Sequence, residues 1–226
     1  MDLKNRVVVV TGALGSLGRA VSAAAVAAGA TVVAVDVVNG EPAPGVEPSP
    51  ALDLGDAEAT RAALAAIAAK HGRIDALVNV AGGFRWESVA DGSIDTWDLL
   101  YKLNVRTAVN ASRAALPHFP ASGGRIVSIG ANGAVKAGLG MGAYAASKAG
   151  VARFTEALAE ELKSRNITVN AVLPSIIDTA PNRADMPDAD FSTWVTPQAL
   201  ADVILFLLSD RAEAVTGALL PVTGRV

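Results

Sequence analysis

The sequence contains no cysteine, and only 4% of its 226 residues are aromatic. A chain without cysteine forms neither disulfide bonds nor thiolate metal sites. Its two histidines, His71 and His118, lie far apart and near the ends of predicted helices. We therefore expect both to be surface residues, and we expect no metal site.

The sequence also lacks a run of basic residues and a long run of apolar ones. The net charge is −3, which provides no electrostatic basis for binding nucleic acid. Its apolar stretches are short and broken by glycine or charge, so no segment is expected to span a membrane. Residues 1–6 lead into a strand-like run without the apolar core of a signal peptide. These absences predict a cytoplasmic protein with neither a nucleic-acid nor a membrane partner.

The chain does contain a regular alternation of two kinds of segment. Short β-branched runs predict buried strands at Val7–Val10, Thr31–Val37, Ile74–Asn79, Arg125–Ile129, Ile167–Leu173 and Leu219–Val222. Alanine-rich patterns predict helices at Leu17–Ala28, Ala57–Lys70, Thr96–Leu116, Ala143–Ser164 and Pro197–Leu208. This alternation predicts an α/β fold class. Residues 1–226 should form a single doubly wound, Rossmann-type domain with helices on both faces of a parallel sheet.

Two segments do not follow this alternation. Asn39–Pro50 holds four of the eleven prolines and is expected to be a surface loop. Residues 175–195 are polar and interrupted by proline, and they are too long for a simple connection. We interpret them as a candidate lid over a substrate.

Three glycines follow the first predicted strand and open the first helix. Gly12, Gly15 and Gly18 are spaced Gly-x-x-Gly-x-x-Gly, which lets the backbone approach a pyrophosphate at a helix N-terminus. Leu14 and Leu17 lie within the same turn. Tight strand–helix packing is the alternative, but the position after the first strand favours a dinucleotide site.

The end of the second predicted strand carries an acid, Asp36. A carboxylate there accepts hydrogen bonds from an adenosine ribose and repels a 2′-phosphate. No Arg or Lys follows in residues 37–40 to bind that phosphate. We therefore favour NAD(H) as cofactor, with NADP(H) as the alternative. A structural role in a turn at the end of the strand also stays open.

Further polar and small residues fall at strand ends. They are Asp53, Leu54, Asn79, Ala81 and Gly82. Ligands bind at the carboxyl edge of such sheets, so these residues are candidate cofactor contacts. A helix N-cap for Asp53 and a turn for Asn79 and Gly82 are the alternatives.

Tyr144 and Lys148 are four residues apart, so both project from one helix face. A phenol with a pKa near ~10 is a poor acid–base catalyst at neutral pH unless a nearby cation stabilises the phenolate. Lys148 supplies such a cation. The pair is a candidate catalytic centre, and an exposed helix pair is the alternative.

Taken in order, these motifs resemble the short-chain dehydrogenase/reductase family over essentially the full chain. The matching positions are the glycine turn, Asp36, Asp53, Asn79–Gly82, Asn104, Tyr144, Lys148 and Pro174–Thr179. The resemblance implies an NAD(P)-dependent oxidoreductase that acts on a small molecule. Tyr144 would be the proton donor or acceptor, and Lys148 would lower its pKa and hold the nicotinamide ribose. Asn104 would position a proton-relay water, and Pro174, Ile177 and Thr179 would lie along the nicotinamide.

The resemblance also implies that the Thr96–Leu116 and Ala143–Ser164 helices pair across a two-fold axis. Both helices carry apolar residues on more than one face. We therefore expect a homodimer or a homotetramer.

One residue departs from the family pattern. The family normally has a serine thirteen residues before the tyrosine, where it steadies a substrate carbonyl, and here that position is Ala131. Ser128 comes too early and lies within a predicted strand. Asn132 is the alternative donor.

A narrower resemblance, to the dihydropteridine reductases within this family, accommodates that alanine. It rests on the glycine spacing, on alanine at the serine position and on the lid from Asp178 to Trp194. It implies quinonoid dihydropterin as substrate. The candidate substrate contacts besides Ala131 are Met141 and three aromatic residues suited to stack on a flat heterocycle, Phe84, Trp86 and Trp194. Ordinary packing of these loop aromatics is the alternative. Asn104 and Phe84 depart from it. A general carbonyl or alcohol oxidoreductase, or an NAD-binding regulatory protein that has lost activity, are the alternatives.

Overall fold

The computed structural model describes all residues, 1–226, and contains one seven-stranded sheet. All its strand pairs are parallel, in the order β3-β2-β1-β4-β5-β6-β7. The strands are β1 (Val7–Thr11), β2 (Thr31–Val35), β3 (Glu47–Pro48), β4 (Ala76–Asn79), β5 (Gly124–Ile129), β6 (Ile167–Pro174) and β7 (Leu219–Val222). The expected doubly wound α/β fold is confirmed.

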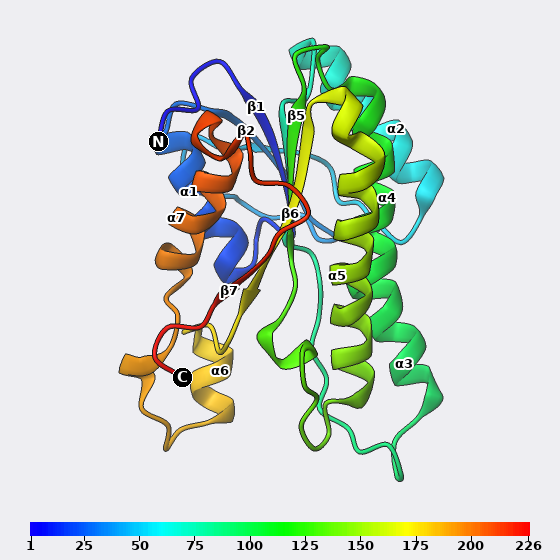
Figure 1. Ribbon diagram of the computed structural model, residues 1–226, viewed down its shortest axis with the longest axis vertical. Helices are drawn as coiled ribbons and strands as arrows, with labels where there is room; N and C mark the ends of the chain where they lie inside the picture. The colour runs from blue at the N-terminus through cyan, green and yellow to red at the C-terminus, as the bar shows by residue number, and fades with distance from the viewer.

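Helices cover both faces of this sheet (Figure 1). On one side lie α1 (Ser16–Ala27) and α7 (Pro197–Leu208), and on the other lie α2 (Ala57–His71), α4 (Thr107–Ala115) and α5 (Gly142–Leu162). Strand residues alternate between the two cores that result. Val8 and Val10 pack with α1 and α7, whereas Val9 packs on the α2, α4 and α5 side.

Local sequence signals explain where two of these helices begin. The Asp56 carboxylate accepts hydrogen bonds from the Glu58 and Ala59 N–H groups and caps α2. Thr196 caps α7 by accepting from Ala199 N–H, and Pro197 follows at the first helical position. Both helices therefore begin where their side chains satisfy free N–H groups.

The structure corrects several predicted elements. The helix expected at Thr96–Leu116 is three segments: α3 (Ile94–Tyr101), a π-helical turn at Lys102–Arg106, and α4. The Asn39–Pro50 loop contains the two-residue edge strand β3. The lid contains a short helix, α6 (Ala180–Asp185). No helix is both long and apolar enough to cross a membrane.

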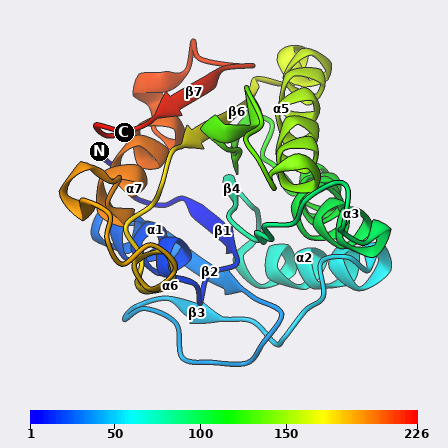
Figure 2. The ribbon, with the colours of Figure 1, turned by 90° about the horizontal axis from the view of Figure 1, so that it is seen from below.

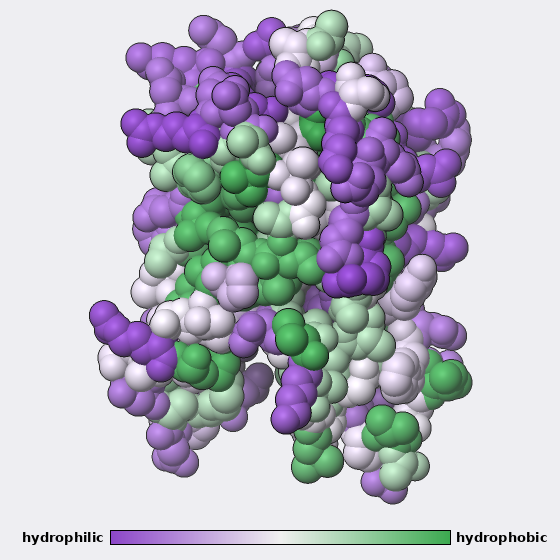
Figure 3. Space-filling view, in the orientation of Figure 1, coloured by the Kyte–Doolittle hydropathy of each residue, from purple (hydrophilic) through white to green (hydrophobic).

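The strand order reverses between β1 and β4, because the chain moves outward from β1 to β3 and then returns. Ligands of open α/β sheets bind outside the carboxyl ends of the strands at such a point. In Figure 1 this edge faces downward, and Figure 2 looks onto it. Figure 3 shows this end divided into two lobes with a hollow between them. The fold thus places the α6 lid on one side of the hollow and the loops before α3 and α5 on the other.

Candidate active site

The turn after β1 is built so that only glycine fits at two of its positions. Gly12 has φ +60°, and a Cβ there would lie 2.8 Å from the Cα of Ala81. A Cβ on Gly18 would overlap the Gly12 carbonyl oxygen and lie 2.6 Å from the Cα of Ala13. These two glycines are therefore required by the packing of the turn itself.

Gly15 differs from the other two glycines. A Cβ there would meet only the Gly12 oxygen, at 3.4 Å, so the packing of the chain does not require glycine. Gly15 is exposed and precedes the first turn of α1, which has no side-chain cap and no acidic residue. The free N–H groups of that turn and its positive dipole fit the pyrophosphate of a dinucleotide. Leu17 is buried in the same turn and packs in the core beneath it.

Asp36 lies one residue beyond β2 and contacts the glycine turn directly. Its Oδ2 accepts from Leu14 N–H at 2.9 Å, and its Oδ1 accepts from Val37 N–H at 2.8 Å. The carboxylate thus has a structural role in the turn at the end of the strand. It also lies beside the glycine turn, where a cofactor contact is expected. Arg19, in the first turn of α1, donates to the carbonyls of Leu14 and Glu41.

Asp53 is exposed at the same edge and forms an ion pair with Lys102, 2.9 Å from Oδ2 to Nζ. Its Oδ1 accepts from Gly55 N–H at 2.7 Å. The hydrogen bond from Lys102 is the largest cause that lowers the pKa of Asp53, followed by the Gly55 N–H. Leu54 is buried, and its carbonyl accepts from the Asn110 side chain.

Asn79 serves the interior of the fold. Its amide nitrogen donates to Ser112 Oγ at 3.1 Å and to Ser128 Oγ at 3.3 Å, and its amide oxygen is buried. This side chain joins β4 to β5 and α4 and does not face the hollow. Ala81 and Gly82, which follow β4, do border the glycine turn and the catalytic residues respectively.

Tyr144 and Lys148 both lie in α5, one turn apart, as the spacing predicts. Lys148 is buried, and its ammonium donates to the Ile129 carbonyl at 2.7 Å. The ring of Tyr144 meets the ring of Phe84 edge-on, with centroids 4.9 Å apart. The lysine is therefore held at the carboxyl end of β5 and the tyrosine at the aromatic side of the hollow.

Burial shifts the pKa of both groups. It raises the pKa of Tyr144 to about 12 and lowers the pKa of Lys148 to about 8. Desolvation by burial is the cause of the Tyr144 shift, and it acts against the lowering of the tyrosine pKa that the family resemblance implies for Lys148. A phenol with this pKa is a proton donor at neutral pH.

Asn104 occupies the middle of the π-helical turn, Lys102–Arg106. Its side chain accepts from Gly83 N–H at 2.9 Å and donates to the Gly83 carbonyl at 3.0 Å and to Ser147 Oγ at 2.9 Å. A Cβ on Gly82 would lie 2.6 Å from its Oδ1 and 3.4 Å from Lys148 Nζ. Asn104 and Lys148 therefore converge on one point, and a π-turn is a common device for re-aiming a functional side chain.

The structure places no serine hydroxyl at the position that the family serine would occupy, thirteen residues before the tyrosine. Ala131 is buried at the end of β5, and Ser128 points toward Asn79 within the fold. Asn132 follows Ala131, begins the 3-10 turn and is half-buried. No substrate-directed hydroxyl replaces the missing one at this position.

Apolar side chains form the rim of the hollow near Tyr144. Phe84 and Trp86 are 57% and 58% exposed, and Met141 is the residue just before α5. Trp86 donates to the Leu139 carbonyl at 2.9 Å and packs on Gly140. This contact joins the two loops that border the site, so the rim is an ordered apolar surface.

The lid is tied down by its own contacts. Ile177 pairs with Val195, and Thr179 caps α6. Arg183 forms two hydrogen bonds to Asp178, at 2.5 and 2.8 Å, and its guanidinium lies 4.7 Å from the Phe191 ring centroid.

Two of the expected contacts at the lid, Pro174 and Trp194, are buried. Pro174 ends β6 and leads into the lid. Trp194 is only 6% exposed and packs on Phe191, which fits a core residue rather than a stacking surface.

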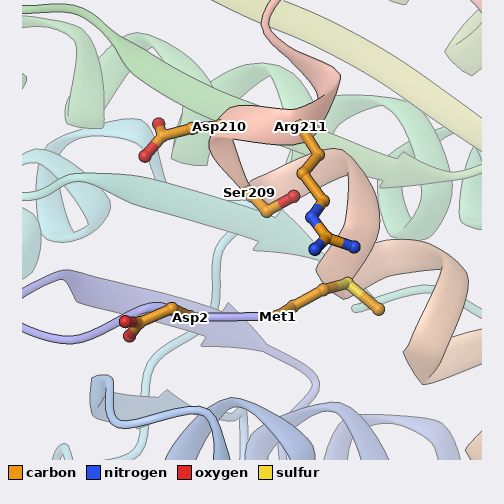
Figure 4. A pocket seen from close by; sticks show the side chains of 5 residues that line it. All are labelled: Met1, Asp2, Ser209, Asp210 and Arg211. Atoms are coloured by element: carbon orange, nitrogen blue, oxygen red, sulfur yellow. The ribbon is translucent and has the colours of Figure 1, made fainter.

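A surface cavity of about 410 Å³ lies elsewhere in the molecule. It is lined by Met1, Asp2, Ser209, Asp210 and Arg211, at the end of the sheet opposite the glycine turn (Figure 4). None of the predicted site residues contributes to it. No group of three or more His, Asp or Glu side chains is arranged to hold a metal ion.

Three features of the site were not predicted from the sequence. The π-turn has no sequence signal. The Lys102–Asp53 pair joins residues 49 positions apart, which no local pattern reveals. Ser147, which donates to the Tyr144 carbonyl at 2.7 Å, has the i, i+3 spacing that would have identified it.

Comparison with known proteins agrees with this geometry. A model of the short chain dehydrogenase family matches residues 6–190. The 3-oxoacyl-[acyl-carrier-protein] reductase FabG of Thermotoga maritima is 32% identical over a 243-residue alignment that covers 99% of this chain and 98% of that protein. The 2-dehydro-3-deoxy-D-gluconate 5-dehydrogenase of Escherichia coli is also 32% identical, over 99% of this chain and 96% of that protein. Neither relative is named for a dihydropterin substrate.

Solved structures with this fold include complexes with either nicotinamide cofactor. Carveol dehydrogenase from Mycobacterium avium, in complex with NAD, has a TM-score of 0.88 and 26% identity over 98% of this chain and 97% of that one. A short chain dehydrogenase from Burkholderia cenocepacia, in complex with NADP, has a TM-score of 0.88 and 30% identity over 99% and 98%. Cofactor preference must therefore be argued from the residues of this chain.

Proposed function

Because the chain belongs to the short-chain dehydrogenase/reductase family, as a match over residues 6–190 establishes, we propose that it is an NADH-dependent reductase of a small conjugated acceptor. The observation that carries this proposal is the convergence of Tyr144, Lys148 and Asn104 at the carboxyl edge, next to a glycine turn with free N–H groups. Quinonoid dihydropterin is the leading acceptor.

Residues of the turn and of the strand ends would hold the cofactor. The α1 N-terminus fits the pyrophosphate, and Asp36 fits the adenosine ribose, where its charge disfavours a 2′-phosphate. Pro174, Ile177 and Thr179 would flank the nicotinamide. When bound, NADH supplies the hydride that reduces the acceptor.

The proton comes from the chain's own residues. With a pKa raised to about 12, Tyr144 holds its proton at neutral pH and can donate it to an acceptor atom within reach of its hydroxyl. Lys148, charged below a pKa of about 8, stabilises the phenolate that remains and would hold the nicotinamide ribose. Asn104, fixed by Gly83 and Ser147, would position a water that returns the proton.

The choice of acceptor rests on the absent serine and on the apolar rim. A ketone develops negative charge on one oxygen and needs preorganised donors, whereas an electron-poor heterocycle accepts hydride with less such help. Ala131 removes one donor, and exposed Phe84 and Trp86 suit a flat ring. Both features favour the conjugated acceptor.

A general carbonyl reductase is the second candidate. It is favoured by the 32% identity to a 3-oxoacyl reductase over nearly the whole chain and by the half-buried Asn132 beside Ala131. A cofactor-binding protein without activity is disfavoured by the presence of both Tyr144 and Lys148.

The deciding experiment is a turnover assay with NADH. Chemically generated quinonoid dihydropterin is compared with a panel of ketones, including a 3-oxoacyl thioester. Fast reduction of the pterin and slow reduction of ketones supports the leading proposal, and the reverse supports the second. NADH binding without turnover of any acceptor would contradict both.

A further inference from the structure

The outer end of the cofactor site and its catalytic end are joined by a side chain that the proposed function does not use. Lys102 is the first residue of the π-turn, two positions before Asn104. Its ammonium lies 2.9 Å from Asp53 Oδ2, and Asp53 is a candidate cofactor contact at the carboxyl edge of the sheet. The Lys102–Asp53 ion pair therefore connects Asp53 to the π-turn that contains Asn104.

The packing around this pair shows that Lys102 is directed to Asp53 by its surroundings. A Cβ on Gly55 would overlap Cε of Lys102, so the lysine stem lies across a residue without a side chain. The other oxygen of Asp53 is held by Gly55 N–H at 2.7 Å, which fixes the carboxylate that receives the ammonium.

A second tie holds the same helical unit farther along. Asn110 of α4 donates to the Leu54 carbonyl at 2.8 Å. The π-turn is therefore anchored on both sides to the segment 53–55, by Lys102 before Asn104 and by Asn110 after it. Because π-turns are rare interruptions of α-helices and occur frequently at functional sites, the two anchors bear directly on where Asn104 is held.

We propose that Lys102 is a positioning residue, which by its ion pair with Asp53 holds the π-turn so that Asn104 keeps its place between Gly83 and Ser147. The role of Asn104 in turnover rests on the proposed function. The effect of the Lys102–Asp53 ion pair on the position of Asn104 does not depend on it. Its consequence is that Asp53, a candidate cofactor contact, also helps to hold Asn104 in place at the catalytic end.

The primary test is hydrogen exchange of the Gly83 amide, which is bonded to Asn104 Oδ1. In Lys102→Met its protection should fall about two- to fivefold, the range that a half-exposed ion pair supports. Lys102→Arg should restore it. Lys70→Met is the matched control, because it breaks the exposed Lys70–Glu47 pair far from the site and should leave Gly83 unchanged.

Two further measurements separate positioning from a general loss of stability. Asp53→Ala should reduce Gly83 protection to the same extent, and the double variant should lose no more than either single one. In the unmodified protein, protection should fall with salt between about 0.02 and 0.5 M toward the Lys102→Met value, while that variant stays flat. If Lys102→Met does not fold, the arginine variant and the salt series still decide.

Activity supplies the functional readout. Lys102→Met and Asp53→Ala should lower kcat by the same two- to fivefold factor, while only Asp53→Ala raises the KM for NADH. Unchanged Gly83 exchange in Lys102→Met, or independent losses in the double variant, would overturn the proposal. Absence of turnover with every acceptor would instead contradict the proposed function, and the exchange data would still test the tie.

Discussion

Replacing Ala131 with serine restores the donor that the family pattern contains, and it tests which acceptor the site has been shaped for. Ala131 is 5% exposed and has an extended backbone, φ −157° and ψ 138°, just before a 3-10 turn at Asn132–Ala134. A serine here occupies an N-cap position. Its oxygen can accept from a free N–H of that turn while its O–H still points to a substrate.

The size of the effect follows from this geometry. Removing one preorganised donor to a developing oxyanion typically costs about 10²–10³ in rate. Tyr144 already supplies one donor, so a serine at position 131 should recover part of the lost rate. We expect kcat/KM for ketones to rise about tenfold or more from a low baseline. Quinonoid dihydropterin reduction should stay nearly unchanged or slow down. As a cap, the serine should also add about 0.5–2 kcal/mol to the free energy of unfolding.

The assay is kcat/KM with NADH for both acceptor classes in the unmodified protein and in Ala131→Ser, with thermal unfolding as a check on folding. Asn132→Ala, made in both backgrounds, is the control for the alternative donor. The reasoning would be refuted if the unmodified protein reduced ketones fast, if Ala131→Ser did not improve this rate, and if Asn132→Ala abolished it. The carbonyl reductase proposal would then replace the pterin one.

Further predictions concern the cofactor, the proton donor, pH and assembly. NADH should be preferred over NADPH in kcat/KM, and Asp36→Ala should narrow that preference. Asp36→Asn keeps an acceptor for the Leu14 N–H, so it should narrow the preference with less loss of stability. Equal use of NADPH by the unmodified protein would contradict the role of the Asp36 charge. Tyr144→Phe should impair both acceptors, the ketone more than the pterin, since the pterin relies less on proton delivery; equal losses would argue against this difference. With the pKa of Lys148 lowered to about 8, kcat/KM should fall as pH rises through 8. Lys148→Arg stays charged over this range, so the fall in kcat/KM with pH should be absent in that variant. Between pH 8 and the ordinary value of 10.5 the unfolded chain keeps a proton that the folded chain has released, so the free energy of unfolding should rise with pH there, and Lys148→Met should abolish that slope. Finally, the helical stretches Thr96–Leu116 and Ala143–Ser164 should pair across a two-fold axis to form at least a homodimer, and a monomeric mass by light scattering at micromolar concentration would contradict this.

The fold was predictable because its signals are local and repeated. Each buried strand is a short β-branched run, and each helix has an alanine-rich pattern with a recognisable start, such as Thr196 and Pro197 at α7. Boundaries were less predictable. The second strand ends at Val35 rather than Val37, because Asp36 turns its carboxylate onto the glycine turn and pairing with β1 stops there.

The candidate site was predictable where its residues share one turn or one helix. Tyr144 and Lys148 are one helical turn apart, and the three glycines lie within seven residues that join β1 to the first turn of α1. The sequence could not reveal that Asn79 faces Ser112 and Ser128, or that Trp194 is a buried residue of the lid. Those outcomes depend on neighbours far away along the chain.

By itself, the sequence determined the fold class, the order of the motifs along the chain, and the absence of a serine at position 131, since all three follow from residue type and spacing. Only the tertiary structure decided the protonation tendencies and the ties between segments. Burial among distant elements sets the pKa values of Tyr144 and Lys148, and the π-turn brings Asn104 to Gly83. Desolvation and long-range hydrogen bonds arise from packing, which periodicity along one chain does not encode.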